Sequence, residues 1–218
     1  MDQETLFTAS KWEILKSLSN GQKSPLELAR ETKTSIANIS QQLRMLELAN
    51  IVKSVRVGNR ERGEPRLLYS LIGPLSYIIS ASPNFAEKKQ LILTQYNEII
   101  FRIWFVKDEN AQYYLQKFFW EIESKLDKIE MIIVKSEYAK LRMIIISEDA
   151  ELKKEIKSKD IKKSKNESRR IDVSVLTKNG FQISLKQEEE FSVNDELNVI
   201  YDPLNLFSKI KKEMEKKV

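Results

Sequence analysis

Apolar residues in the first fifty positions recur every three or four residues, with short polar breaks between the runs. This spacing predicts three successive helices, within residues 9–21, 24–32 and 35–51. Ser24, Pro25 and Glu27 open the second helix with the sequence of a capping box, and Ser35 is placed to cap the third. The third helix has one inward stripe, formed by Ile36, Ile39, Leu43 and Leu46.

Two runs rich in branched apolar residues follow, IVKSVRV and RLLYSLI, on either side of GNRERGEP at residues 58–65. The runs predict two strands, and the glycine-bounded segment between them predicts a hairpin turn. The order along the chain is therefore helix, helix, turn, helix, strand, turn, strand. The turn does not need Arg60 and Arg62 at its tip, so these two arginines call for another explanation.

Residues 84–106 predict a long amphipathic helix with Asn84 as its cap. Its apolar residues follow a spacing of seven with others between, which is typical of a helix–helix seam. We expect this seam to hold two copies together, through Phe85, Ile92, Tyr96, Ile99 and Ile103. Burial of the same stripe within its own subunit is the alternative.

The last third of the chain changes to a period of two. After a helix at 110–127, strands are expected at KIEMIIVKSE, KLRMIIIS, RIDVSVLT, FQISL and ELNVIYD, with helices at EDAELKKEIKS and NLFSKIKKEMEKK. The predicted fold class is α+β: an N-terminal winged helix-turn-helix, central amphipathic helices and a C-terminal domain with a mixed sheet. The expected domains are 1–75, a linker with dimerisation helices at 76–109, and 110–218.

Composition narrows the chemistry more than it identifies it. The 218 residues carry a formal net charge of +5, which suits an acidic partner such as nucleic acid. Histidine and cysteine are both absent, which excludes Ser-His and Cys-His nucleophiles and removes the usual zinc ligands. No run approaches the length of a membrane span and the start is unlike a signal peptide, so we expect a cytoplasmic protein without a membrane partner.

The stretch from Lys11 to Gly73, above all SPLELARETKTSIANISQQLRMLELANIVK, resembles the winged helix-turn-helix of the ArsR and MarR regulators. The resemblance implies that the third helix enters the major groove of double-stranded DNA. With the apolar stripe inward, the outward polar side chains suit bases and phosphates. The residues expected to contact DNA here are Lys33, Thr34, Ser35, Ala37, Asn38, Gln41, Gln42 and Arg44.

In this reading the turn at 58–65 is the tip of the wing. Arg60 and Arg62 at the tip, and Arg56 on the strand before it, would meet DNA phosphates, because a guanidinium pairs well with them. From Lys33 to Arg66 there are seven Lys and Arg against three Asp and Glu. The alternative is a charged turn that serves only solubility.

The C-terminal part resembles, in its order of elements, small nucleotidyltransferases of the DNA polymerase beta superfamily. Where that family has Gly-Ser, this chain has Lys135 and Ser136; where it has Asp-x-Asp, Lys140 and Arg142 stand; the third aspartate position is Asp172. Two metal-binding carboxylates are thus replaced by cations. The resemblance therefore implies a domain that does not catalyse metal-assisted transfer.

The main hypothesis is a sequence-specific transcriptional regulator, a homodimer on a palindromic operator, without enzymatic activity or cofactor. Two alternatives remain: a nucleotidyltransferase-fold enzyme with a fused DNA-binding module, and a winged helix that binds protein. An unrelated α+β oligomerisation or ligand domain also fits the C-terminal part. The sequence does not identify an effector.

Overall fold

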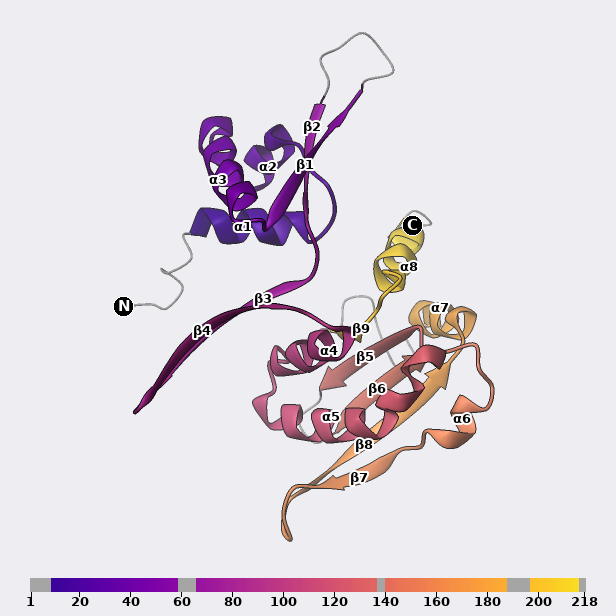
Figure 1. Cartoon of the computed structure of the whole chain (residues 1–218). Helices are drawn as coiled ribbons and strands as arrows, with labels where there is room; N and C mark the ends of the chain where they lie inside the picture. Colours follow the sequence, from indigo (N-terminus) through magenta and orange to yellow (C-terminus); the bar gives the residue numbers. More distant parts are fainter. Residues whose placement is uncertain (1–8, 59–65, 137–139, 188–196, 216–218) are drawn as a thin grey trace. The chain divides into compact units, whose positions relative to one another are not determined.

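The computed structural model describes residues 9–58, 66–136, 140–187 and 197–215. These residues divide into two compact units, Met1–Leu93 and Thr94–Val218. Nothing in the described part of the chain is a helix long and apolar enough to cross a membrane. The predicted α+β class is confirmed (Figure 1), since each unit contains both helices and strands.

The first unit begins with three helices and a two-stranded hairpin around one core. Its elements are α1 (Ala9–Leu18), α2 (Pro25–Glu31), α3 (Ile36–Leu48), β1 (Val52–Val57) and β2 (Arg66–Leu71). The core gathers Ile14, Leu28, Ile39, Leu43 and Tyr69. Lys23, in the connection between α1 and α2, exchanges both backbone hydrogen bonds with Tyr69 and so forms a one-residue antiparallel β-bridge beside β2.

Two helix ends in this unit require a left-handed backbone. Lys33 has φ +53° and follows α2, and Thr34 N–H donates to the Ala29 carbonyl at 3.1 Å. Asn50 has φ +55° after α3, with Ile51 N–H on the Leu46 carbonyl at 2.9 Å. Both are Schellman turns. They set the directions in which α3 leaves α2 and β1 leaves α3.

The helix expected over residues 84–106 is wrong in its first half. Residues 75–92 form a second hairpin, β3 (Leu75–Ser82) and β4 (Phe85–Ile92), turned at Pro83 and Asn84. Asn84 has φ +64°, a conformation that asparagine tolerates and that a type II turn needs at the residue after its proline. It is therefore a turn residue and not a helix cap. Only α4 (Gln95–Trp104), capped by Thr94, remains of the predicted helix.

The second unit is a five-stranded mixed sheet in the order β7-β8-β6-β5-β9. Only β6 and β8 are parallel. Its elements after α4 are α5 (Glu109–Ile122), the 3-10 helix Glu123–Lys128, β5 (Met131–Ser136), β6 (Leu141–Ile146), α6 (Leu152–Glu155), β7 (Lys159–Lys162), β8 (Ser168–Leu176), α7 (Lys178–Gln187), β9 (Asn198–Tyr201) and α8 (Leu206–Glu215).

Each face of this sheet has its own apolar core. Helices α4 and α5 cover one face, against Val134 and Met143, and α7 and α8 cover the other, against Ile133 and Ile144 (Figure 1). Because both faces are covered, the central strands are apolar at nearly every position instead of alternating. This explains the runs MIIV and MIII in the sequence.

Two further predictions for the second unit differ from the structure. FQISL was expected as a strand but lies in α7, where Phe181 and Leu185 are buried one turn apart. Ile183, whose place between them suggested alternation, is exposed. The helix expected at EDAELKKEIKS is the single turn α6, and the lysine-rich stretch after it contributes β7.

Candidate nucleic-acid interface

Helix α3 is placed by its connection to α2. In α2, the Ser24 side chain accepts the Glu27 N–H while Glu27 accepts the Ser24 N–H at 2.7 Å, which is the predicted capping box. Ser35 caps α3 by accepting the Asn38 N–H at 3.2 Å, also as predicted. The short turn between the helices leaves the N-terminal turn of α3 at the surface, where a recognition helix presents its first residues.

The exposed face of α3 carries most of the predicted polar residues. Gln41 and Arg44 are exposed, and so are Lys33, Ser35 and Ala37 around the start of the helix. Ile36 was expected in the inward stripe but is 49% exposed, because the first turn of α3 projects beyond the core. Met45 and Leu48 are also exposed apolar residues on this helix, and neither was singled out from the sequence.

Asn38 and Gln42 are half-buried rather than fully outward. Asn38 Nδ2 donates to Thr34 Oγ1 at 3.0 Å, and Gln42 Nε2 donates to Asn38 Oδ1 at 3.4 Å. The three side chains form a ladder along one side of the helix. Both amide atoms of Asn38 are thus engaged within the protein, whereas the Gln41 side chain makes no hydrogen bond with any described residue.

The wing begins with β1 and β2. Ser54 Oγ on β1 donates to Glu47 Oε1 on α3 at 2.6 Å, which ties the wing to the helix. Arg56 is exposed on β1 as expected, and Arg66, which the sequence reading did not select, is exposed on β2 opposite Val57. The sequence signal that could have selected Arg66 is its place directly after Pro65, where the second strand of the wing begins. Arg60 and Arg62 lie outside the described residues.

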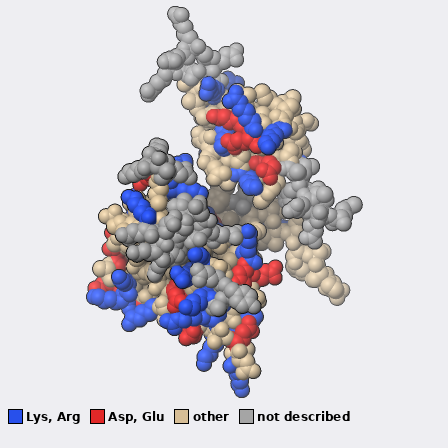
Figure 2. All heavy atoms as spheres, turned by 180° about the vertical axis from the view of Figure 1, so that it is seen from behind, with Lys and Arg blue, Asp and Glu red and all other residues tan. Residues whose placement is uncertain are grey.

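The two glutamates of α2, Glu27 and Glu31, accept hydrogen bonds from neighbouring residues. Lys23 and Ser17 donate to the Glu31 carboxylate, Lys23 at 2.5 Å, and these contacts hold the Glu31 pKa below its usual value. The Ser24 backbone and hydroxyl hydrogen bonds lower the pKa of Glu27. Figure 2 shows acidic and basic side chains intermixed on the face it presents, so charge alone does not outline the interface there.

The residues expected to form a dimer seam do not lie on one helix. Phe85 and Ile92 lie at the two ends of β4, and Tyr96, Ile99 and Ile103 lie on α4 in the other unit. Ile99 and Ile103 are buried in the core of their own unit, so for them the alternative reading applies. Tyr96 accepts a hydrogen bond from Trp120 Nε1 at 2.8 Å.

Three of the five positions compared with nucleotidyltransferases are neighbours across the sheet. Strand register places Lys135, Arg142 and Asp172 side by side on β5, β6 and β8. Asp172 accepts from Arg170 Nε at 2.7 Å. Within the described ranges, no group of three or more metal-ligating side chains is close enough to hold an ion.

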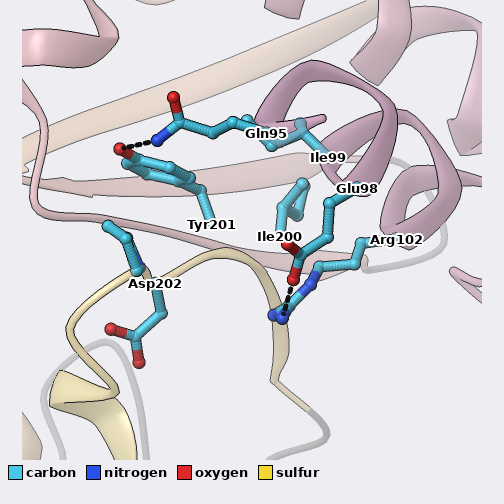
Figure 3. A pocket seen from close by; sticks show the side chains of 8 residues that line it. Gln95, Glu98, Ile99, Arg102, Ile200, Tyr201 and Asp202 are labelled. Atoms are coloured by element: carbon cyan, nitrogen blue, oxygen red, sulfur yellow. Dashed lines mark hydrogen bonds and ion pairs between the residues drawn. The ribbon is translucent and has the colours of Figure 1, made fainter. Parts of the chain in front are cut away.

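A small cavity of about 50 Å³ lies between α4 and β9 (Figure 3). Its polar groups are engaged with one another: Gln95 Nε2 donates to Tyr201 Oη at 2.7 Å, and Arg102 contacts Glu98 at 2.5 Å and the Val199 carbonyl at 3.2 Å. It is smaller than the ~300–1,000 Å³ of typical small-molecule pockets. It therefore identifies no effector.

Three helices, with α3 displayed after a tight turn from α2 and followed by a two-stranded wing, define a winged helix-turn-helix domain. Residues 9–54 match the family model described as bacterial regulatory protein, arsR family. The N-terminal resemblance to ArsR regulators is thereby confirmed, and the segment is that of DNA-binding transcriptional regulators. The match ends before the second hairpin and the second unit, so it gives the nucleotidyltransferase resemblance no support.

Two solved structures of mutants of ZitR from Lactococcus lactis are also similar, at 29% and 27% sequence identity. They cover 30% and 33% of this chain and 42% and 47% of those chains, with TM-scores of 0.27 and 0.28. The similarity thus spans less than half of the ZitR chains. No curated protein matches the sequence.

Proposed function

We propose that the protein is a sequence-specific transcriptional regulator that binds a palindromic operator as a homodimer in the cytoplasm. The observation that carries the proposal is the exposed polar face of α3, with Gln41 and Arg44 on a helix of the ArsR type. One such helix reads only a few base pairs. Two copies related by a two-fold axis read two half-sites about one helical turn apart and reach useful specificity.

In this proposal the wing supplies affinity. Arg56 and Arg66, with Arg60 and Arg62 from the tip, contact phosphates on either side of the groove, which adds sequence-independent and salt-dependent binding. The second unit contributes assembly or sensing. Genomic binding-site mapping tests the whole proposal: an inverted repeat is expected, and enrichment without any motif would contradict it.

Replacement of Arg60 and Arg62 together by alanine should weaken binding to all duplexes alike. Each lost phosphate contact flattens the plot of log K against log salt by about 0.9, so the slope should fall by about two units. Binding is measured by fluorescence anisotropy between 50 and 300 mM KCl, a range chosen to make the slope measurable.

The control removes the same charge elsewhere, by replacing Lys153 and Lys154 on α6 with alanine. It should leave the slope unchanged. A slope unaffected by both double variants would mean that the wing does not touch DNA. If wild-type binding itself showed no salt dependence, the winged helix would be a protein-binding module.

A further inference from the structure

The second hairpin stands apart from the rest of its unit. β3 and β4 pair over eight residues and join no other strand among those described. None of the hairpin side chains that the structure describes is buried. A two-stranded hairpin alone is marginally stable in water, and three or more strands with an apolar face are needed for independent stability. Something therefore has to complete it.

Apolar side chains project from both faces of this hairpin. Residues opposite each other in an antiparallel pair share a face, and each face carries large apolar groups: Tyr77, Ile79 and Ile92 on one, Ile78, Phe85 and Leu91 on the other. Ile92 is 86% exposed, Ile79 57% and Phe85 53%. A partner that packed on one face would leave the apolar side chains of the other face in water. Strands added at the edge extend both faces, so the apolar side chains of each face gain cross-strand neighbours.

The two edges of the hairpin differ in charge. β4 carries Glu87, Lys88 and Lys89, whereas β3, LSYIISAS, has no charged residue. Lysines on an edge strand oppose the addition of a further strand, and a long uncharged edge favours it. The open edge of β3 is thus the one built to accept a partner strand.

The backbone of β3 also has its hydrogen-bonding groups in place. Leu93 N–H donates to the Pro74 carbonyl at 3.4 Å, so residues 74 and 93 form an inward-bonded pair. Inward and outward residues alternate along an antiparallel ladder. Leu75, Tyr77, Ile79 and Ala81 therefore direct their N–H and C=O groups away from β4, toward the open edge.

We propose that β3 pairs antiparallel with β3 of a second copy of this chain, in a four-stranded sheet of order β4-β3-β3-β4. The inference rests on the homodimer of the proposed function and assigns its surface. The contact is isologous, since each copy contributes the same strand. The charged β4 strands become the two outer edges and stop further addition, so assembly closes at two copies.

Two alanines that face each other across the hairpin give a matched test. Ala81 is on β3 and Ala86 is its partner on β4, on the same face. Ala81→Lys places a charge in the proposed interface, and Ala86→Lys places the same charge on an outer edge. In sedimentation equilibrium of the full chain, Ala81→Lys should raise the dimer Kd at least tenfold and Ala86→Lys less than twofold, with unchanged circular dichroism.

Cross-linking through introduced cysteines is a second test of the strand order. The chain has no native cysteine, so each introduced cysteine is the only thiol of its copy. Ile79 and Lys88 are also partners across the hairpin. Adjacent strands lie about 4.8 Å apart and the outer strands of four lie about 14 Å apart. A short bismaleimide should therefore join two copies of Ile79→Cys efficiently and two copies of Lys88→Cys poorly.

The outcomes separate this inference from the function on which it rests. A wild-type dimer that Ala81→Lys and Ala86→Lys weaken equally, or that neither weakens, would place the interface elsewhere and overturn the β3 pairing alone. Equal cross-linking at both cysteines would do the same. A wild-type chain that stays monomeric at DNA-binding concentrations, with and without duplex, would overturn the homodimer as well. A monomer in which the second unit protects the hairpin would show as slow exchange of the β3 amides.

Discussion

At the residue scale, the polar side chains of α3, the proposed recognition helix, divide into those hydrogen-bonded within the helix and those exposed without such a bond. The Asn38 side-chain amide is hydrogen-bonded to Thr34 and Gln42, while Gln41, three residues further along the helix, is exposed and makes no hydrogen bond with the described residues. Glutamine can form two hydrogen bonds to the major-groove edge of adenine. The Gln41 amide could bond to a base without first breaking a hydrogen bond to another described residue.

We therefore expect Gln41→Ala to reduce the discrimination between operator and random DNA by about 1–3 kcal/mol, the range for one lost bidentate base contact. Asn38→Ala should reduce it less, because its amide is already engaged. The ratio of the two dissociation constants, measured in one buffer, reports this. Equal losses on operator and random DNA for Gln41→Ala would assign this residue to phosphate contact.

Asp108 has a partly buried carboxylate that links α5 to β5 and β8. It caps α5 through the Ala111 N–H and accepts from Ser136 at 2.6 Å and Arg169 at 2.7 Å. Burial alone raises the pKa of Asp108, but the hydrogen bonds from Ser136 and Arg169 outweigh it and the pKa lies below its usual value. The carboxylate thus favours the folded state when ionised.

Asp108→Asn keeps a good helix cap and removes only the charge. Because the side chains of Arg169 and Asp108 are 11% and 27% exposed, their pair is only partly buried, and we expect a loss of about 1–2 kcal/mol, between that of an exposed pair and that of a buried one. The wild-type contribution is complete above pH ~3.9, the unfolded value, and disappears as pH falls through the lower folded pKa. Urea unfolding followed by Trp104 and Trp120 fluorescence at pH 7 and pH 3 measures both effects.

Glu151→Gln provides the control, because its pair with Lys154 is exposed on both sides. Such pairs contribute less than about 1 kcal/mol. If Asp108→Asn lowered the free energy of unfolding at pH 7 no more than this control does, the Asp108 contacts would contribute no more to stability than an exposed pair.

At the element scale, the capping box at the start of α2 stabilises the first of the two helices of the helix-turn-helix. Ser24→Ala removes one half of the capping box and should destabilise the first unit by about 1 kcal/mol. Trp12 is the only tryptophan of residues 1–93, so fluorescence reports this unit during urea unfolding when Trp104 and Trp120 are replaced by phenylalanine in all variants compared. Ser40→Ala, at an exposed site inside α3, should cause no loss. An equal loss for both would show that capping is not the cause.

Local signals predicted the first unit well and the middle of the chain poorly. The capping box, the Ser35 cap and the inward positions Ile39, Leu43 and Leu46 follow from short-range chemistry, and the structure has them. Residues 84–92 satisfy a spacing of seven but pair with β3, which is a tertiary choice. The overlooked signs were the uncharged run LSYIISAS, with its branched and aromatic residues, and the turn residues Pro83 and Asn84 that follow it.

The same limit applies to α7 and to the candidate site. Phe181 and Leu185 fit a strand or a helix equally, and only the core beneath them decides. The exposed face of α3 was predictable from its apolar stripe. The Thr34–Asn38–Gln42 ladder was not, because it depends on side-chain conformations that spacing does not encode.

At the scale of the whole molecule, each unit has its own core, and the helix-turn-helix and the wing belong entirely to the first. We therefore expect residues 94–218, expressed alone, to unfold in one cooperative transition with near-native stability. Calorimetry measures this. A fragment 94–196, which lacks β9 and α8, is the control and should not fold cooperatively. A molten 94–218 would mean that the units depend on each other.

Strand β9 comes late in the chain but completes the sheet beside β5, which was made far earlier. On the ribosome, residues 9–71 can close their core long before β9 emerges, while β5 waits with one edge uncovered. A premature stop codon before β9 would therefore release a product with a folded helix-turn-helix and an unpaired β5 edge, which favours aggregation. Such a product would compete for operators while it aggregates, so late truncations should act as dominant alleles rather than simple losses.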